Sequence, residues 1–318
     1  MIKYSVITPV FNRADCIARC IESVINQINT NELEYEHIIV DDGSRDNTAN
    51  IVSEYTKKYN HIKFIKLAEN KGTNTARNTA IKVATGNYCI ILDSDDYFIE
   101  DALYKINECI KNKNYKHYLF TPDDRYEVFC NSSIFKENNI FKYADFLSEK
   151  ITGDFIHIIR TEIMQNNLFD ESLRIHEGVF FLRFYKEAQE IYFNNTIVTI
   201  RERGRNDSVS KEYITINKNI ILNNIKAIEI KINWFENEYI RLKQTYILYK
   251  QYTQLLNYYL ILGEYNKCKL IFKKIEQIGF HVSNKQKTMY MFRLGAIYRS
   301  MLFLYFTIKY KYLNFKTK

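Results

Sequence analysis

The sequence predicts an α/β fold, with a doubly wound and mostly parallel sheet, followed by a helical C-terminal extension. Three observations support this prediction. Short apolar runs alternate with amphipathic segments over the first part of the chain, which is the order of a parallel βαβ sheet. Acidic residues directly follow two of these runs, where the strands of such a sheet end. From about residue 217 the apolar residues recur at three- and four-residue spacing, which is typical of long helices.

The first βαβ unit is expected over residues 4–41. Its first strand, residues 4–9, is apolar and ends at Pro9, because proline has no backbone N–H to donate to a neighbouring strand. Residues 14–27 carry apolar side chains on one helical face, and a second apolar strand at residues 35–41 completes the unit.

The units that follow are delimited by acidic residues and glycines. A helix is expected from about Asp46, after an acidic turn, and a strand at residues 63–67 follows it. The next helix, residues 73–84, lies between Gly72 and Gly86, because glycine marks helix ends. The later elements expected in the sheet domain are strands at residues 88–92, 118–120, 153–160 and 191–200 and helices at residues 99–111, 141–149 and 161–167.

The distribution of charge divides the chain at about the same place as the pattern of apolar residues does. Residues 209–318 hold 19 Lys and Arg against 6 Asp and Glu, a net charge of +13, whereas residues 1–208 have a net charge of −5. The expected domains are therefore a sheet domain over residues 1–210, with halves at about 1–112 and 113–210, and a basic helical region over residues 211–318. Helices of that region are expected at residues 220–235, 238–262, 267–278 and 289–315.

A metal site is expected at the end of the strand at residues 88–92. Its apolar residues run into the carboxylates of Asp93, Asp95 and Asp96, and a divalent cation is the usual partner of carboxylates crowded beside a core. The chain has neither GxGxxG after its first strand nor GxxxxGK[ST] anywhere, which disfavours dinucleotide redox chemistry and P-loop phosphoryl transfer. A nucleotide is therefore expected to be held through the metal. For Asp96, capping of the next helix is an alternative.

Four short motifs follow one another over about 95 residues. They are SVITPVFN at residues 5–12, VDDGSRDNT at 40–48, NKG and ARN within 70–78, and LDSDD at 92–96. In this order they resemble the signatures of family-2 glycosyltransferases of the bacterial surface-polysaccharide type, which have the Rossmann-like GT-A fold. The acidic turn taken alone favours an ordinary helix cap, so the joint pattern carries the resemblance.

The resemblance implies a donor site built from these motifs. Asp42 stands where the family accepts a hydrogen bond from uracil, so the expected donor is a UDP-sugar. Asp95 is implied as the direct ligand of Mn²⁺ or Mg²⁺, whose charge stabilises the departing diphosphate. The implied nucleotide-binding residues are Pro9, Val10, Phe11, Asp42, Arg77, Asp93 and Ser94.

A second signature, at residues 169–183, resembles the segment in which the family places an acid before an aromatic helix. Registering it on residues 180–183 makes Glu177 the implied general base, although Glu-Asp or Gly-Asp is the common form there. One such base opposite the leaving diphosphate implies inversion at the anomeric carbon. A helix N-terminal acid, favoured by the macrodipole, is the alternative for Glu177.

Further contacts to diphosphate or acceptor are expected from Asp154, His176, Arg203, Arg205 and Ser208. The arginines and the serine suit a loop that closes on diphosphate, because guanidinium donors match phosphate oxygens. The alternatives are a turn role for Asp154, a surface or packing role for His176, and a solvated basic loop at residues 201–210.

The tail at residues 289–318 combines apolar and aromatic residues with Lys and Arg. It is expected to lie on a membrane surface, with a homodimer interface or packing on the sheet domain as alternatives. An N-terminus that enters a strand at once, and six cysteines without a CxxC pair, predict a protein of the cytoplasm, peripheral on the inner face of its membrane. No uncharged apolar run reaches the length of a membrane span, and nucleic acid is not expected as a partner.

Together these features predict an inverting, divalent-metal-dependent glycosyltransferase. It is expected to move a hexose or N-acetylhexosamine from a UDP-sugar to a glycan or lipid-linked saccharide, in capsule, O-antigen or lipooligosaccharide synthesis. The alternative is a non-catalytic sugar-nucleotide-binding protein or a membrane-associated scaffold, because Glu177 and Gly178 depart from the common form of the second signature.

Overall fold

The computed structural model describes residues 1–27, 33–137, 139–173, 176–203, 218–301 and 304. It divides the chain into two compact units, Met1–Gly204 and Arg205–Lys318. The domain boundary placed at residue 210 from the sequence lies outside the described residues. Each unit buries apolar side chains of its own.

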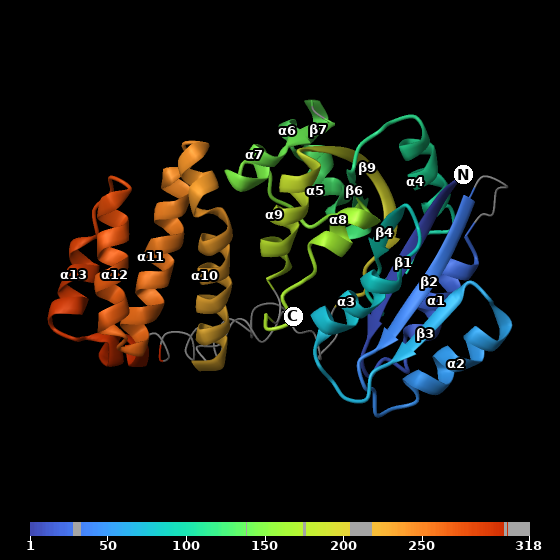
Figure 1. Ribbon diagram of the computed structural model, residues 1–318, viewed down its shortest axis with the longest axis horizontal. Coiled ribbons are helices and arrows are strands. Elements are labelled where there is room, and N and C mark those ends of the chain that lie inside the picture. Colours follow the sequence, from blue (N-terminus) through green and yellow to red (C-terminus); the bar gives the residue numbers. More distant parts are fainter. Residues whose placement is uncertain (28–32, 138, 174–175, 204–217, 302–303, 305–318) are drawn as a thin grey trace. The chain divides into compact units, whose positions relative to one another are not determined.

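One sheet runs through the described part of the first unit (Figure 1). Its strand order is β3-β2-β1-β4-β8-β6-β9-β5, and β7 pairs with β9. The strands are β1 (Ile2–Val10), β2 (Leu33–Asp41), β3 (Ile62–Lys66), β4 (Tyr88–Ile91), β5 (Tyr97–Phe98), β6 (His117–Pro122), β7 (Ile140–Lys142), β8 (Ile156–Arg160) and β9 (Glu190–Ile200).

The predicted doubly wound, mostly parallel sheet is confirmed. β1 pairs in parallel with β2 and β4, β2 with β3, and β6 with β9, whereas β8 runs antiparallel to both β4 and β6. In register, Val10 lies opposite Asp41, and Ile7 lies opposite Ile91. The carboxyl ends of β1, β2 and β4 therefore meet at one edge of the sheet, where ligands of such sheets bind.

Helices cover both faces of this sheet. α1 (Ile17–Ile25) and α4 (Ala102–Lys111) share one hydrophobic cluster with Tyr4 of β1 and Ile90 of β4. α3 (Thr73–Val83) packs on β1 and β2, and its buried residues lie outside that cluster, because alternate residues of a strand point to opposite faces. The other helices of this unit are α2 (Thr48–Lys58), the short 3-10 turn η1 (Asp123–Arg125), α5 (Tyr126–Asn131), α6 (Ser133–Glu137), α7 (Tyr143–Leu147), α8 (Thr161–Asn166) and α9 (Glu177–Ala188).

The helix predicted at residues 141–149 is shorter than expected. The residues before it form β7, which pairs with β9, and α7 begins only at Tyr143. Asp145 accepts a hydrogen bond from the backbone N–H of Lys142 (2.9 Å), which satisfies a donor at the start of the helix. Pairing with a strand far along the chain leaves no mark in the local periodicity, so the sequence did not predict β7.

The described part of the second unit is helical, with α10 (Lys218–Arg241), α11 (Thr245–Leu262), α12 (Tyr265–Gln277) and α13 (Asn284–Met291) (Figure 1). The helix break predicted at residues 236–237 is wrong. These positions hold neither proline nor glycine, and α10 continues through them. The chain turns instead at Lys243, whose backbone is left-handed (φ 56°).

The tail helix predicted at residues 289–315 is interrupted. α13 ends at Met291, the chain turns around Arg293 (φ 51°), and residues 295–301 are helical again. The remainder of the predicted helix, apart from residue 304, lies outside the described residues. Among the helices of the described residues, none combines the length and the hydrophobicity that a membrane crossing requires.

Candidate active site

The loop after β4 carries the acidic motif that the sequence predicted as the metal site. Side chains from the start of α1 hold the backbone carbonyl groups of this loop. The contacts are Cys16 Sγ to the Ser94 oxygen (3.6 Å), Cys20 Sγ to the Asp93 oxygen (3.8 Å) and Arg19 Nη2 to the Asp95 oxygen (3.1 Å). Burial raises the pKa of the Cys20 thiol, so this group remains a neutral donor. The path of the loop is therefore determined by bonds to its main chain.

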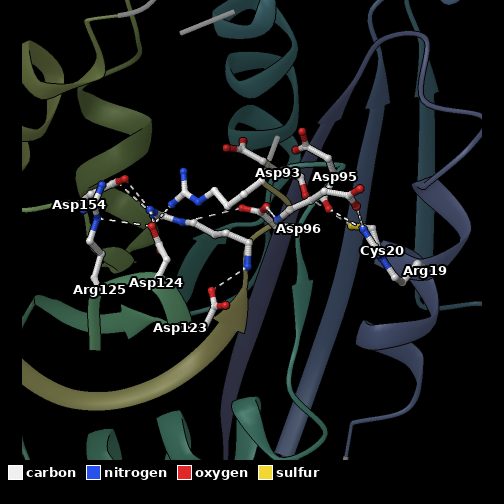
Figure 2. A network of polar contacts seen from close by, with 12 residues as sticks. Arg19, Cys20, Asp93, Asp95, Asp96, Asp123, Asp124, Arg125 and Asp154 are labelled. Carbon is white, nitrogen blue, oxygen red and sulfur yellow. Dashed lines mark hydrogen bonds and ion pairs between the residues drawn. The ribbon is translucent and has the colours of Figure 1, made fainter. Parts of the chain in front are cut away.

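Three carboxylates gather on this loop (Figure 2). The side chain of Asp93 is 50% exposed, whereas that of Asp96 is 14% exposed. Burial, together with the negative charges of Asp93 and Asp95, raises the pKa of Asp96 to about 7. The loop thus concentrates negative charge at the edge of the sheet where β1, β2 and β4 end.

This donor set fits a divalent ion that protein and substrate hold together. Among the described residues, no group of three or more His, Cys, Asp or Glu side chains is arranged to hold a metal ion by itself. Mg²⁺ in nucleotide sites is commonly held by only one or two carboxylates together with substrate phosphates. The carboxylates of Asp93 and Asp95 provide oxygen ligands of that kind.

Arg77 joins the acidic loop to the predicted base. Its side chain, on α3, is 6% exposed, and Nη2 pairs with Asp93 Oδ1 (3.1 Å) while Nη1 pairs with Glu177 Oε1 (2.5 Å). Burial alone would lower the pKa of Arg77, but the charges and hydrogen bonds of these two carboxylates outweigh it and raise the pKa. The guanidinium is therefore a permanent cation between two acids 84 positions apart in the chain. The sequence did not reveal this pairing.

Asp42 holds the loop before α3. Its Oδ1 accepts a hydrogen bond from the backbone N–H of Lys71 and its Oδ2 from that of Gly72, both at 2.8 Å. Gly43 makes the approach of this loop feasible, because it has φ 74° and a Cβ there would lie 2.6 Å from the carbonyl carbon of Glu69. Burial raises the pKa of Asp42. Its predicted contact with uracil stays a prediction.

The other predicted donor residues lie at the end of β1. The backbone carbonyl oxygen of Val10 accepts a hydrogen bond from the N–H of Asp42 (2.8 Å), so the two strand ends are joined. Pro9 and Val10 are buried, whereas Phe11 is 37% exposed. Phe11 is thus the member of this group that presents a large side chain to solvent.

Glu177 is the first residue of α9, and its side chain is 39% exposed. His176 precedes it with a left-handed backbone (φ 104°), and Phe180 and Phe184, three and seven residues after Glu177, are buried on the same side of the helix. This turn and packing direct Glu177 toward Arg77. The position of Glu177 at a helix N-terminus fits both an acid favoured by the helix macrodipole and a general base. The pairing with Arg77 is a further contact, which the macrodipole alone does not require.

Asp154 and Arg203 belong to a second polar cluster, organised by Arg201 at the end of β9. Arg201 is 12% exposed, and its ion pairs reach Asp154 (2.5 Å), Asp124 (3.8 Å) and Asp96 (3.9 Å). Arg203 pairs with Asp124. Figure 2 shows this network extending from Asp93 and Asp95 to Asp123, Asp124 and Asp154. Arg205 and Ser208 lie outside the described residues.

The alternative role considered for Asp96, a cap of the following helix, is wrong. α4 begins at Ala102, and its N-cap position is Asp101. Asp96 Oδ1 instead accepts a hydrogen bond from the backbone N–H of Glu202 (3.0 Å), and the carboxylate of Glu202 pairs with Arg19. Asp96 therefore ties the acidic loop to the end of β9. Its place directly beside the DSD motif was the only sequence signal of this role.

Comparison with known proteins identifies the family. A family model described as "Glycosyl transferase family 2" matches residues 5–187, more than half of the chain. The chain belongs to this family. The match spans the acidic loop, Arg77 and Glu177, and it confirms the predicted family of transferases.

Two curated relatives of this family 2 glycosyltransferase illustrate the similarity. A GalNAc(5)-diNAcBac-PP-undecaprenol beta-1,3-glucosyltransferase from Campylobacter jejuni is 29% identical over 225 residues, 66% of this chain and 68% of that protein. A poly(ribitol-phosphate) beta-glucosyltransferase from Bacillus spizizenii is 42% identical over 104 residues, 32% of this chain. The chain matches only 16% of the length of the Bacillus protein.

Solved structures share the fold. Staphylococcus aureus TarS 1-349, in complex with UDP-GlcNAc, has a TM-score of 0.61 at 19% identity and covers 97% of this chain and 91% of that one. The mannosyltransferase PcManGT from Pyrobaculum calidifontis, in complex with GDP-Man and Mn²⁺, has a TM-score of 0.56 at 14% identity, with coverages of 95% and 86%. These likenesses confirm the predicted GT-A fold.

Proposed function

We propose that this family 2 glycosyltransferase transfers a hexose or N-acetylhexosamine from a UDP-sugar to a glycan or lipid-linked saccharide of a cell-surface polymer, with inversion. The observation that carries the proposal is the bridge by Arg77 between Asp93 and Glu177. It joins the acidic loop expected to hold the donor to the carboxylate expected to act on the acceptor. The names of the two curated relatives, both glucosyltransferases, and the UDP-GlcNAc complex of TarS support the same reaction class.

Each residue of the cluster has a part in the proposed reaction. When bound, Mn²⁺ or Mg²⁺ supplies charge that stabilises the departing diphosphate, and Asp95 is its proposed ligand. Glu177 takes the proton of the attacking hydroxyl as the new bond to the anomeric carbon forms and the bond to the diphosphate oxygen breaks. Arg77 orients Glu177 and compensates its charge before the proton arrives. Attack opposite the leaving group inverts the anomeric carbon.

The proposed donor site at the acidic loop is tested by titration calorimetry of UDP, GDP and CDP. We expect UDP to bind in the presence of Mn²⁺, to lose most of its affinity in EDTA, and to lose it equally in Asp95→Asn. Asp101→Asn is the matched control, because Asp101 is a neighbouring acid that pairs with Lys105 outside the cluster. If no nucleotide binds the wild type, or if Asp95→Asn binds UDP normally, the proposed donor site is wrong.

The proposed role of Glu177 as general base is tested by the release of UDP from a UDP-sugar, with water or a glycan as the nucleophile. We expect Glu177→Gln to keep UDP affinity and to lose about a hundredfold or more in kcat, the usual contribution of a general base. UDP binding without turnover in the wild type would favour the alternative, a non-catalytic sugar-nucleotide-binding protein. Its motivation is the pair Glu177-Gly178, which stands where Glu-Asp or Gly-Asp is common.

A further inference from the structure

The end of the second unit exposes a row of large apolar side chains. Five of them have exposed fractions between 60% and 68%, and these are Met291, Phe292, Ile297, Met301 and Leu304. Soluble proteins expose single apolar side chains routinely, but several on one helix face, as at Ile297, Met301 and Leu304, mark an interaction surface. We call the five side chains together the apolar row.

The helix at residues 295–301 fixes which way the row points. Gly295 packs so closely on α11 that a Cβ there would lie 1.8 Å from the carbonyl oxygen of Leu260. Ile297, Met301 and Leu304 are spaced by four and three residues and lie on the helix side opposite Gly295. Side chains of residues on that side therefore point away from α11.

The segment that carries the apolar row has charges of one sign. Glu276 is the last acidic residue of the sequence, so residues 277–318 contain no Asp or Glu. In the described part of this segment, the exposed basic residues are Lys285, Lys287, Arg293 and Arg299. Two of them lie over aromatic rings, Lys285 Nζ 4.9 Å from the ring centroid of Tyr298 and Arg293 Cζ 5.5 Å from that of Tyr265. The row is thus bordered by cations that no nearby acid in sequence compensates.

We propose that the apolar row and its basic border form a docking surface for an anionic lipid bilayer. Apolar side chains enter the region between headgroups and acyl chains, while Lys and Arg remain at the level of the anionic headgroups. A second copy of this chain fits poorly, because pairing two such surfaces brings together eight cations of a segment, residues 277–318, that holds no acid of its own. The surface lies on the bilayer and does not cross it. This proposal is independent of the proposed glycosyl transfer.

The experiment is sedimentation of the full chain with vesicles of phosphatidylcholine alone or mixed with phosphatidylglycerol. We expect binding to the mixed vesicles that weakens with salt, and little binding to phosphatidylcholine alone. Each Lys or Arg near an anionic surface contributes about a fivefold change in partition, so Lys287→Gln/Arg299→Gln is expected to weaken binding roughly thirtyfold. Lys269→Gln/Lys273→Gln, which removes two exposed lysines of α12, is the matched control.

The apolar contribution is tested by Ile297→Asp/Met301→Asp, with Leu270→Asp as control because Leu270 is 62% exposed on α12. The double variant is expected to abolish vesicle binding, and the control to retain it. Binding that is equal in the double variant and the wild type, or absent in the wild type, would overturn the proposal. A dimer in sedimentation that the double variant dissociates, without vesicle binding, would assign the surface to a second copy instead. UDP titrations on the same proteins report the donor site separately.

Discussion

Replacing Arg77 with methionine tests the ion pairs that join the acidic loop to Glu177. The guanidinium is 6% exposed, and its partners Asp93 and Glu177 are 50% and 39% exposed. Because water can solvate both acids once the cation is gone, the loss of stability falls below the ~3–5 kcal/mol of a fully buried pair, and we expect about 2 kcal/mol. A misdirected Glu177 is expected to lower kcat about a hundredfold.

The two kinetic constants separate the roles that Arg77 can have. In the proposed role Arg77 acts on Glu177, so the KM for the UDP-sugar and the affinity for UDP stay within about threefold of the wild type while kcat falls. Initial rates of UDP release and calorimetric titration measure both. Arg160→Met, which removes the guanidinium stacked 4.5 Å over Tyr88, controls for loss of an arginine elsewhere in the sheet. A large rise in KM at unchanged kcat would refute this reasoning and assign Arg77 to donor binding.

Three further predictions concern stability, measured by urea denaturation. Gly43→Ala is expected to lower the free energy of unfolding by about 2 kcal/mol, because Gly43 has φ 74° and a close backbone neighbour. Gly178→Ala is the control and should leave the free energy of unfolding unchanged, because no atom lies within 4 Å of the new Cβ. Equal losses in the two variants would contradict this account. Arg201→Gln is expected to cost about 3 kcal/mol, since its side chain is 12% exposed and pairs with three aspartates, but Arg203→Gln, at 55% exposure, less than about 1 kcal/mol. Comparable losses would show that the Arg201 cluster is not structural. Burial raises the pKa of Glu36, but its lysine, serine and threonine partners lower it from 4.5 to about 2. Its stabilisation is therefore complete above pH 4.5 and lost as the pH falls to about 2, so the difference between wild type and Glu36→Gln, at most about 3 kcal/mol, should shrink in that window. A difference that stays constant would argue against this account.

The sequence predicted the parts of the fold and site that local pattern determines. Apolar runs and glycines located the strands and helices of the first half, and the acids after β4 were recognised because they end a buried strand. Glu177 was located from its spacing to the aromatic residues of α9, and it does begin that helix. In each case the signal lies within a few residues of the feature.

Contacts between distant segments were not predictable from one sequence. Nothing local indicates that Arg77 pairs with Glu177, or that Asp96 binds the backbone at the end of β9 rather than capping α4. The end of α10 was misplaced for a related reason. Lys243 turns the chain with a left-handed backbone, a conformation for which glycine is the expected signal.

The contacts between the start of α1 and the loop after β4 make the path of this loop independent of the side chains that the loop carries. Cys16, Arg19 and Cys20 bind carbonyl oxygens, which every residue type possesses, so exchange of the side chains at positions 93 to 95 leaves those three bonds in place. Substitutions there can alter ion preference or donor choice while the loop retains its path. Such an arrangement lets a lineage of transferases diversify in specificity without rebuilding the architecture that supports it.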